Sequence, residues 1–367
     1  MTTRIAVVNA GSSSLKLQIL DGSQEVAART LERWSADAAP EELEEFIDNA
    51  GALDAVGHRV VHGGSVHSGP VVLDDAVVDY LESLTDLAPL HQPKAVAAIR
   101  ALRALLPEVP QIACFDTAFH STIPAANATY AVPWEWTQRW GLRRYGFHGL
   151  SHAYASRRGA ELAGRDVADA RIVTCHLGAG ASLCAVRDGA SVDTTMGFTP
   201  LEGLVMATRS GSVDPGMVLW LQEHADLTVD DLSVGLTREG GLAGVSGVGG
   251  DLRDVSDAAS AGSDRAGLAL AVYDHSLASL TSAMITSCGG LDVLVFTGGV
   301  GEHSVERRGQ LVASLAYLGI ELDDAANRAT QSDGVISSTA SSAAVVVVTA
   351  REDLQIASSV EQLLLNG

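Results

Sequence analysis

One short pattern occurs twice in this chain and restricts its fold more than any other feature. An apolar strand, a cluster of small residues and a second strand of alternating apolar and polar residues span positions 5–20 and again 172–186. Small residues between two such strands predict a β-hairpin. Aligning Asn9 with His176 also brings Gly11 opposite Gly178. The repeat predicts two related domains, one in each half of the chain, and a chance pairing of two common Gly/Ser hairpins is the alternative.

Between and after the hairpins, strand patterns alternate with helix patterns. Strands are expected at 54–62, 111–115, 291–296 and 345–349, and helices at 40–50, from Ser151 to 163, from about 304 and from about 352. Ser151 is a suitable N-cap, and Gly164 is a suitable stop for the helix that it would begin. The alternation predicts an α/β protein with largely parallel sheets. A length of 367 residues, at about 150 per domain, allows two or three domains.

The charge balance limits the partners of the protein. Lys and Arg total 24 and Asp and Glu total 45, which gives a net charge of −21. Because such a surface repels phosphate backbones and anionic lipid, we expect neither nucleic acid nor a membrane surface as a partner. The sequence holds only two lysines, Lys16 and Lys94. An anionic ligand must therefore meet a local group of arginines.

Cysteine usage and the N-terminal sequence favour a cytoplasmic protein. Cys114, Cys175, Cys184 and Cys288 lack CxxC spacing and lie in apolar runs, so we expect buried free thiols rather than disulfides or zinc ligands. The first residues lack the apolar segment and cleavage site of a signal peptide. The longest apolar stretch, 343–348, is too short to span a bilayer.

Both hairpin tips have the composition of a phosphate site. Small side chains let backbone N–H groups approach an anion. In the first hairpin, Lys16 would add a positive charge and Asn9 a neutral oxygen for the water shell of a metal. A P-loop is excluded, because Leu15 precedes the lysine and a strand follows it. Either hairpin alone is better explained as a tight turn with polar filler, but the two together favour nucleotide phosphates.

Two strand ends carry candidate binding groups. Strand alternation places Arg59 and Val61 on one face of their strand and His58 and His62 on the other. A zinc site at the two histidines would lack a further ligand nearby, so structural histidines are favoured. Asp116 ends a strand where α/β sheets bind ligands, and a helix N-cap is the equally favoured alternative.

Later segments add further candidates. His148 is flanked by glycines in Tyr145–Gly149, and the spacing to the next histidine lacks the glutamate of a metalloprotease motif. The long loop-like stretch 196–215 contains one cation, Arg209, which either serves a site or pairs with Asp214 at the surface. Gly299-Val300-Gly301 follows a strand and is a weak signal for a nucleotide held over a helix N-terminus. Together these residues suit a small anion beside the terminal phosphate of a nucleotide, although spacing alone does not bring them together.

At these residues the sequence resembles the acetate and propionate kinase family, within the sugar kinase, Hsp70 and actin superfamily. Seven motifs occur in order and cover nearly the whole chain: Asn9–Ser14, His58–Gly64, Leu87–His91, Phe115–His120, Tyr145–Gly149, Met196–Glu202 and Phe296–Glu302. The resemblance implies two duplicated ribonuclease H-like (actin-like ATPase) α/β domains with a cleft between them. Residues 1–118 with 351–367 would form the N-terminal domain, and 119–350 the C-terminal domain, for nucleotide binding and dimerisation.

The resemblance also implies an activity and a set of site residues. The activity is reversible transfer of the ATP γ-phosphoryl group to acetate, giving acetyl phosphate for acetyl-CoA biosynthesis, with Mg²⁺ or Mn²⁺, in a cytoplasmic homodimer. By position, Asn9 and Glu352 would hold the metal, and Asp116, His148 and Arg209 would be catalytic, with Asp116 as acid/base. Arg59 would bind the carboxylate, with Val61, Leu90, Phe147 and Pro200 lining the methyl pocket. ATP would contact Ser14, Lys16, His176, Leu177, Gly178, Ala179, Gly180, Asp251, Leu252, Arg253, Gly299, Val300, Gly301, Glu302 and His303.

The chemistry explains why these residue types are needed. Acetate has a carboxyl pKa like that of Asp or Glu, so it is already ionised at pH 7 and needs no base. The difficulty is to bring one anion to another, which requires cations and an in-line geometry. We therefore expect Asp116 to orient an arginine or metal-bound water rather than to move a proton.

The sequence departs from the family pattern at three positions and leaves alternatives open. Ala179 and His303 stand where asparagine is expected, and Arg351 stands where a small polar residue is usual. Ala179 removes one phosphate contact, so a pyrophosphate-using variant is an alternative, although Asp251-Leu252-Arg253 indicates an adenosine site. Propionate or another short acyl acceptor is the nearest rival to acetate. A sugar kinase or a non-enzymatic actin-like ATP-binding protein would have little use for the arginines.

Overall fold

The computed structural model describes residues 3–11, 14–32, 34, 40–89 and 91–366, and the chain divides into two compact units. Unit 1 comprises residues 1–121, 147–154 and 351–367, and unit 2 comprises 122–146 and 155–350. The division into domains at 118 and 350 stays a prediction. Unit 1 differs from it by also containing 119–121 and 147–154.

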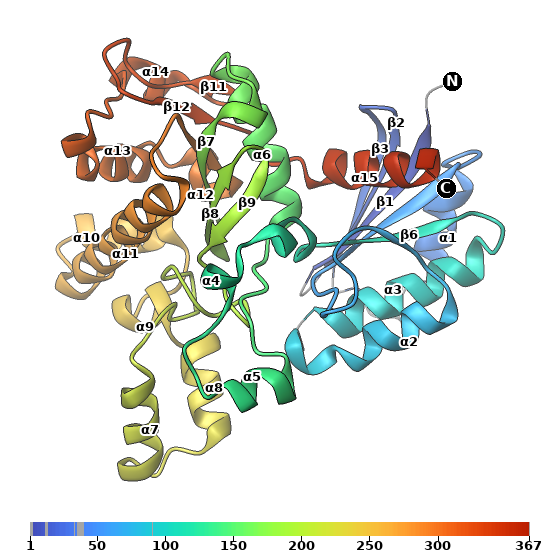
Figure 1. Ribbon diagram of the computed structural model, residues 1–367, viewed down its shortest axis with the longest axis horizontal. Coiled ribbons are helices and arrows are strands. Elements are labelled where there is room, and N and C mark those ends of the chain that lie inside the picture. Colours follow the sequence, from blue (N-terminus) through green and yellow to red (C-terminus); the bar gives the residue numbers. More distant parts are fainter. Residues whose placement is uncertain (1–2, 12–13, 33, 35–39, 90, 367) are drawn as a thin grey trace. The chain divides into compact units, whose positions relative to one another are not determined.

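Unit 1 is built on a six-stranded sheet with the order β3-β2-β1-β4-β6-β5 (Figure 1). Its central strands β1, β4 and β6 are parallel, whereas the other three neighbouring pairs are antiparallel. The strands are β1 (Arg4–Ala10), β2 (Ser14–Asp21), β3 (Gln24–Glu32), β4 (Ala55–Val60), β5 (Val71–Val72) and β6 (Gln111–Phe115).

Unit 2 repeats this sheet. Its strands are β7 (Arg171–Leu177), β8 (Ala181–Arg187), β9 (Ala190–Thr194), β10 (Val293–Thr297), β11 (Gly334–Val335) and β12 (Ala344–Val347). The order β11-β12-β10-β7-β8-β9 becomes that of unit 1 when β1 to β3 are matched with β7 to β9, β4 with β10, β6 with β12 and β5 with β11. The expected duplication of an α/β domain is confirmed. The expectation of largely parallel sheets was wrong, because hairpins extend each parallel centre on one side and a short antiparallel strand closes the other.

The described helices divide between the two units. In unit 1 they are α1 (Pro40–Asp48), α2 (Asp75–Ser83), α3 (Gln92–Leu105) and α15 (Glu352–Asn366). In unit 2 they are α4 (Ala125–Ala128), α5 (Trp134–Trp140), α7 (Pro215–His224), α8 (Val229–Thr237), α9 (Gly241–Ser246), α10 (Leu252–Ser260), α11 (Asp264–Cys288), α12 (Gly298–His303), α13 (Val305–Ser314) and α14 (Asp324–Ala329). Helix α6 (Gly149–Leu162) begins in unit 1 and continues into unit 2.

Both faces of the unit 1 sheet are covered, which explains the unbroken apolar run of β1. Ala6 and Val8 share a core with α1 and α3, whereas Ile5 and Val7 pack with α15 (Figure 1). Gly57 in β4 permits the close approach of α15, because a Cβ there would meet Ile356 Cγ2 at 2.5 Å. The sheet therefore brings Glu352, the first residue of α15, to the strands that carry the first hairpin.

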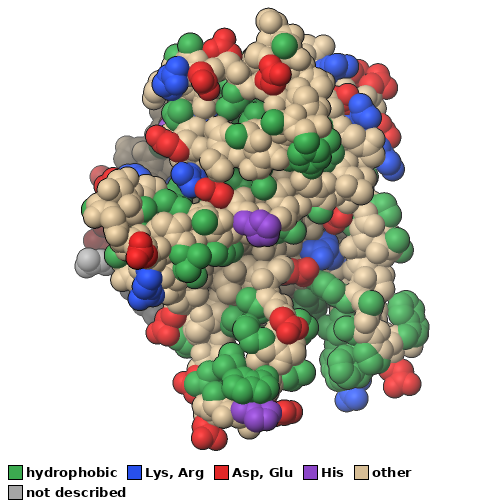
Figure 2. Space-filling view, turned by 90° about the vertical axis from the view of Figure 1, so that its left-hand side faces the viewer, with side chains coloured by type: hydrophobic (Ala, Val, Ile, Leu, Met, Phe, Trp, Pro, Cys, Tyr) green, Lys and Arg blue, Asp and Glu red, His purple; other side chains and the backbone are tan. Residues whose placement is uncertain are grey.

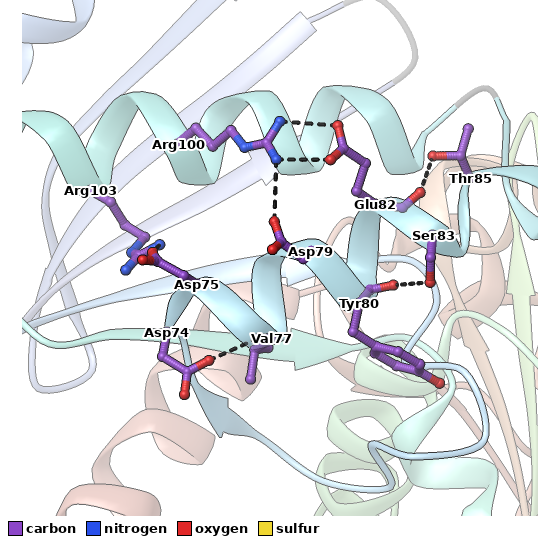
Figure 3. A network of polar contacts seen from close by, with 10 residues as sticks. All are labelled: Asp74, Asp75, Val77, Asp79, Tyr80, Glu82, Ser83, Thr85, Arg100 and Arg103. Carbon is purple, nitrogen blue, oxygen red and sulfur yellow. Dashed lines mark hydrogen bonds and ion pairs between the residues drawn. The ribbon is translucent and has the colours of Figure 1, made fainter.

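The outer surface of unit 1 carries an ion-pair network between α2 and α3 (Figure 3). Arg100 of α3 makes a two-pronged contact with Glu82 of α2, at 3.0 and 2.8 Å. Asp74 caps α2 by accepting the Val77 N–H at 2.8 Å. Because Arg100 is half exposed, this network serves below as a comparison for the more buried arginines.

Two sequence-based expectations about helices were wrong. Helix α6 begins at Gly149, so Ser151 lies inside it, fully buried, instead of capping it. A helix was expected only from about residue 304, but the glycine-rich segment before it is itself helical, as α12. Glycine disfavours helix, so tertiary contacts described below must stabilise this turn.

The cysteines and the longest helix bear on the class of protein. All four cysteines are buried free thiols, as expected. Among the described residues, α11 is the one helix whose length and composition would let it cross a membrane. In unit 2 it packs one face against β7, β8 and β9.

Candidate active site

The sheet of unit 1 aligns three candidate residues in one row. Asn9 of β1 lies opposite Lys16 of β2 and also opposite Arg59 of β4. Asp116 follows the last residue of β6. Because β1, β4 and β6 are parallel, their carboxyl ends meet at one edge of the sheet, where α/β proteins commonly bind ligands. This register places a lysine, an asparagine, an arginine and an aspartate close together.

Arg59 is the centre of this cluster. Its Nε and Nη2 donate to the two carboxylate oxygens of Asp116, at 3.0 and 2.7 Å, and its Nη1 donates to Asn9 Oδ1 at 3.1 Å. Glu352 Oε2 lies 3.5 Å from Arg59 Nε and accepts from Asn9 Nδ2 at 3.4 Å. We call these four residues the Arg59 cluster. Asp116 therefore binds an arginine rather than capping a helix.

The electrostatics of the cluster keep Arg59 charged. Burial opposes the charge, but the carboxylates of Asp116 and Glu352 outweigh burial and raise the pKa of Arg59 above its ordinary value. A guanidinium has five N–H groups, and the contacts above use three of them. Its side chain is 17% exposed. The remaining N–H groups suit a two-pronged contact with a carboxylate ligand.

The same cluster offers oxygen ligands of the kind that Mg²⁺ prefers. Asn9 provides an amide oxygen and Glu352 a carboxylate. Mg²⁺ typically binds one or two protein oxygens, keeps several waters and takes further ligands from substrate phosphates. The described residues contain no group of three or more His, Cys, Asp or Glu that could enclose a metal by themselves. This donor set therefore fits Mg²⁺ held partly by a substrate.

His148 is held beside the Arg59 cluster by the backbone of its neighbour. Gly149 N donates to the carbonyl of Asp116 at 2.8 Å, and a Cβ at position 149 would overlap that oxygen. His148 itself has a φ of 57°, a left-handed conformation that is uncommon outside glycine. Strained residues of this kind concentrate at functional sites. The glycine flank seen in the sequence thus has a positional reason.

The other candidates of unit 1 have different surroundings. Val61 and Phe147 are buried, and the Phe147 ring meets His62 edge-on at 5.6 Å. Leu90, together with Ser12 and Ser13 of the hairpin tip, lies outside the described residues. Ser14 accepts the Gly11 N–H through its carbonyl at 2.8 Å, which closes the hairpin. The Gly11 N–H is therefore used by the turn, and Lys16 is exposed on β2.

His58 and His62 are structural, as favoured from the sequence. Both are fully buried, and His58 Nε2 pairs with Gln111 Oε1 at 2.8 Å. Burial lowers the pKa of each to about 4, so both are neutral at pH 7.

In unit 2, the second hairpin is contacted from two sides. Gly178 N donates to Gly180 O at 3.1 Å, which leaves the N–H groups of Ala179 and Gly180 as the tip donors. Gly298, with a φ of 77°, packs against the Leu177 carbonyl, which a Cβ would approach to 2.8 Å. On the other side, Ala207 N donates to Ala179 O at 3.2 Å. The structure thus brings the hairpin residues His176 to Gly180 together with the start of α12 and with the loop before Arg209.

Arg209 belongs to a long irregular segment, as the sequence predicts. Residues 195–214 form no helix or strand. Arg209 Nη1 donates to Pro200 O at 2.6 Å, and burial lowers the pKa of Arg209. Asp214 instead caps α7 through Gly216 N at 3.0 Å. The alternative of a surface pair between Arg209 and Asp214 was therefore wrong.

The proposed adenosine residues occupy two helix starts. Asp251 caps α10, and Arg253 binds its carboxylate, which lowers the pKa of Asp251 to about 2. Arg253 is strongly exposed. Leu252 begins α10 and is buried. Gly250 before it packs on Ala207, so α10 starts beside the same loop as the hairpin.

Gly299, Val300, Gly301, Glu302 and His303 all lie in α12. Arg308, fully buried, stabilises this short helix by donating to the carbonyls of Gly301 and Glu302 at 3.0 and 2.6 Å. Glu302 Oε1 accepts from Ala350 N at 3.0 Å. Arg308 carried no signal in the sequence, because its partners are backbone carbonyls and the amide oxygen of Asn327, which no motif marks.

The three departures from the family pattern have distinct surroundings. Ala179 is exposed at the hairpin tip, and its carbonyl contacts Ala207. His303 is exposed at the end of α12. Arg351 is bound to Asp353, with Nη2 2.7 Å from Oδ2. Arg351 is thus already paired beside Glu352.

Duplicated six-stranded sheets, each with a small-residue hairpin, and an arginine–carboxylate cluster at the strand ends define an α/β phosphotransferase of the actin-like ATPase fold. The acetokinase family matches residues 35–358. The chain belongs to this family and is an enzyme of the kinase class.

Individual relatives agree with this assignment. The acetate kinase of Nostoc punctiforme is 48% identical over 320 residues, which are 87% of this chain and 79% of that protein. The acetate kinase of Pseudothermotoga lettingae is 38% identical over 99% of this chain and 98% of its own.

Solved structures agree as well. The crystal structure of Porphyromonas gingivalis acetate kinase has a TM-score of 0.90 at 36% identity and covers 99% of this chain and 100% of its own. A propionate kinase from Francisella tularensis has a TM-score of 0.89 at 35% identity, with coverages of 97% and 98%. A sugar kinase and a non-enzymatic ATP-binding protein are therefore set aside.

Proposed function

We propose that this enzyme catalyses the reversible, Mg²⁺-dependent transfer of the γ-phosphoryl group of ATP to acetate, giving acetyl phosphate and ADP. The observation that carries the proposal is the Arg59 cluster at the carboxyl ends of parallel strands. Its arginine is charged, partly exposed and pre-oriented by Asp116. Such a group binds a small carboxylate and reduces its repulsion from phosphate.

Each part of acetate has a proposed contact. The Arg59 N–H groups not used by Asp116 and Asn9 bind the carboxylate. Val61, Leu90, Phe147 and Pro200 line the methyl pocket. Because Val61 and Phe147 are buried, they offer a dry apolar surface on which a methyl group loses its contact with water.

The catalytic roles follow from charge. Acetate is ionised at pH 7, so the transition state needs stabilisation of negative charge more than proton transfer. We assign this to Arg209 and His148, with Asp116 orienting Arg59. The backbone bond from Gly149 to Asp116 keeps His148 and Asp116 in fixed relation, which an orienting role requires.

ATP and the metal have their own residues in the proposal. Ser14 and Lys16 of the first hairpin and His176 to Gly180 of the second contact phosphates, and Asp251 to Arg253 with Gly299 to His303 contact the nucleoside. Asn9 and Glu352 hold Mg²⁺, which supplies neutralisation of phosphate charge when it is bound. The N–H groups of Ala179 and Gly180 give the second hairpin an anion contact that needs no side chain.

A homodimer formed through unit 2 is part of the proposal. Three tryptophans of α5, Trp134, Trp136 and Trp140, are 62%, 48% and 53% exposed, and Trp220 of α7 is 55% exposed. Figure 2 shows hydrophobic side chains gathered in the lower part of the view, where α5, α7 and α8 lie in Figure 1. Exposed aromatic groups of this density are typical of protein interfaces. The buried free thiols and the acidic surface support a cytoplasmic enzyme without nucleic acid or membrane partners.

Propionate is the second candidate acceptor, because a propionate kinase is among the similar structures. One methylene in an apolar pocket changes binding by about 1–3 kcal/mol, so use of both acids is expected.

The test is acyl phosphate formation trapped as the hydroxamate, with acetate, propionate and butyrate in parallel and with ATP or pyrophosphate as the donor. The proposal predicts product with ATP and Mg²⁺, highest with acetate. Product with pyrophosphate alone would replace ATP as donor and implicate Ala179. No product from any acid would refute the proposed activity.

A further inference from the structure

Three side chains that are distant in sequence meet on the loop that carries Pro200. Arg144 Nη2 donates to Glu202 Oε1 at 2.7 Å, and the Tyr130 hydroxyl donates to Glu202 Oε2. Arg144 Nη1 also donates to the carbonyls of Thr195 and Met196, at 3.1 and 3.2 Å. The Tyr130 oxygen in turn accepts the Phe198 N–H at 2.9 Å. The Tyr130 phenol and the Arg144 guanidinium thus hold the loop 195–202 through its backbone and through its own Glu202 carboxylate.

Gly197 lies inside this network, at a position where a side chain would not fit. A Cβ at this position would overlap both the Glu202 carboxylate and the Tyr130 hydroxyl. The Gly197 carbonyl accepts the N–H groups of Tyr145 and Gly146, at 3.1 and 3.2 Å. The next two residues along the chain are Phe147 and His148. The network therefore anchors two segments: the one that leads into Phe147 and His148, and the one that carries Pro200.

Arg209 depends on the same loop. Its Nη1 donates to the Pro200 carbonyl at 2.6 Å, and no carboxylate pairs with it among the described residues. Pro200 lies between Phe198, held by Tyr130, and Glu202, held by Arg144. A shift of this loop would therefore move the methyl-pocket residue Pro200 and the guanidinium of Arg209 together.

We propose that Tyr130, Arg144 and Glu202 form a positioning clamp that sets acyl-chain selectivity and the placement of Arg209 by holding the loop 195–202. This inference rests on the proposed function, because Pro200 and Arg209 matter only if they meet the acyl acceptor. The three residues are positioning residues: each acts through the loop backbone.

The key variant is Glu202→Gln, which keeps the shape of the side chain and removes its charge. Arg144 then loses its carboxylate partner in a site where it is only 17% exposed. Tyr130→Phe removes the phenol oxygen and so both of its bonds. The matched control is Asp292→Asn, which breaks a two-pronged pair with Arg171, at 2.9 and 2.9 Å, at the start of β7 and away from the loop.

The clamp predicts a specific kinetic pattern. In Glu202→Gln, kcat/KM for acetate falls about 10- to 100-fold, as expected when reacting groups are misplaced by about 1 Å. The ratio of kcat/KM for acetate to kcat/KM for propionate falls. KM for ATP changes less than about twofold, because the clamp does not touch the tip of the hairpin 176–180. Because both side chains act through one loop, the double variant with Tyr130→Phe is little worse than Glu202→Gln alone. Asp292→Asn loses stability but keeps the selectivity ratio.

A second measurement tests the clamp without depending on enzyme activity. Amide hydrogen exchange of residues 196–210 should accelerate in Glu202→Gln, with the hairpin 176–180 unchanged. Unchanged exchange in this loop, or an unchanged acetate-to-propionate ratio in an active variant, overturns the clamp. Wild-type protein that forms no acyl phosphate refutes the proposed function, and the exchange result still accepts or rejects the clamp.

Discussion

The contact between Arg59 and Asp116 yields the most informative prediction. Asp116→Asn keeps the size of the side chain but turns one carboxylate oxygen into an NH₂ group. One of the bonds at 3.0 and 2.7 Å is then lost, and two N–H groups face each other. Loss of one charged hydrogen bond costs about 1.5–3 kcal/mol. Removing one partner of a buried pair costs about 3–5 kcal/mol, and the Glu352 carboxylate 3.5 Å from Arg59 Nε offsets part of this.

A net loss of about 3 kcal/mol, if expressed fully in the transition state, lowers the rate about 100-fold. The assay is the initial rate of hydroxamate formation from acetate, ATP and Mg²⁺, with KM measured for each substrate. We expect kcat/KM for acetate to fall about 100-fold and KM for ATP to change little. Turnover within threefold of wild type would refute the orienting role. A clear solvent deuterium isotope effect on wild-type turnover would favour proton transfer by Asp116 instead.

Three further predictions test other parts of the structure. Gly149→Ala should lower the free energy of unfolding by about 1–3 kcal/mol, because its Cβ overlaps the Asp116 carbonyl. It should also lower kcat, and a normal kcat in a folded variant would contradict this. Arg308→Met leaves the Gly301 and Glu302 carbonyls of α12 without their donor, so the free energy of unfolding should fall by about 1–3 kcal/mol for each carbonyl and KM for ATP should rise; thermal unfolding and ATP kinetics check both. Burial lowers the pKa of His58 and His62 to about 4, below the unfolded value of about 6.5, so the unfolded chain binds more protons in this window. Stability is therefore full above pH 6.5 and falls by about 3 kcal/mol per histidine as pH drops toward 4; a His58→Asn variant with an equally steep loss in urea titrations would contradict the assignment.

The strands and the duplication could be predicted because their signals are local. Apolar runs and small-residue turns mark both hairpins, and the matched strand orders confirm that the two copies are equivalent. The edges of the sheets were harder to predict, because whether an outer strand is antiparallel depends on where the hairpins attach. Helix α12 was missed because its glycines disfavour helix, and Arg308 and the Leu177 contact that stabilise it come from elsewhere in unit 2.

The candidate site could be predicted as a list of residues but not as a geometry. Arg59 is 50 residues from Asn9 and 57 from Asp116, and Asn9 is 343 from Glu352. Only strand register and the docking of α15 through Gly57 join them, and neither can be read from spacing. The clamp around Glu202 was missed for the same reason: Tyr130 and Arg144 carry no motif, and Glu202 appeared only as the end of a motif without a role.

The central claim is that Arg59 and Arg209 handle the acyl acceptor in an ATP-dependent kinase. The most direct measurement compares acetyl phosphate formation by wild type, Arg59→Ala, Arg209→Ala and the surface control Arg100→Ala (Figure 3), with folding checked by circular dichroism. The account predicts losses of about 1,000-fold for Arg59→Ala and Arg209→Ala, the scale of a transition-state arginine, and near wild-type activity for Arg100→Ala. Folded Arg59→Ala protein that retains most of its acetate turnover would contradict it.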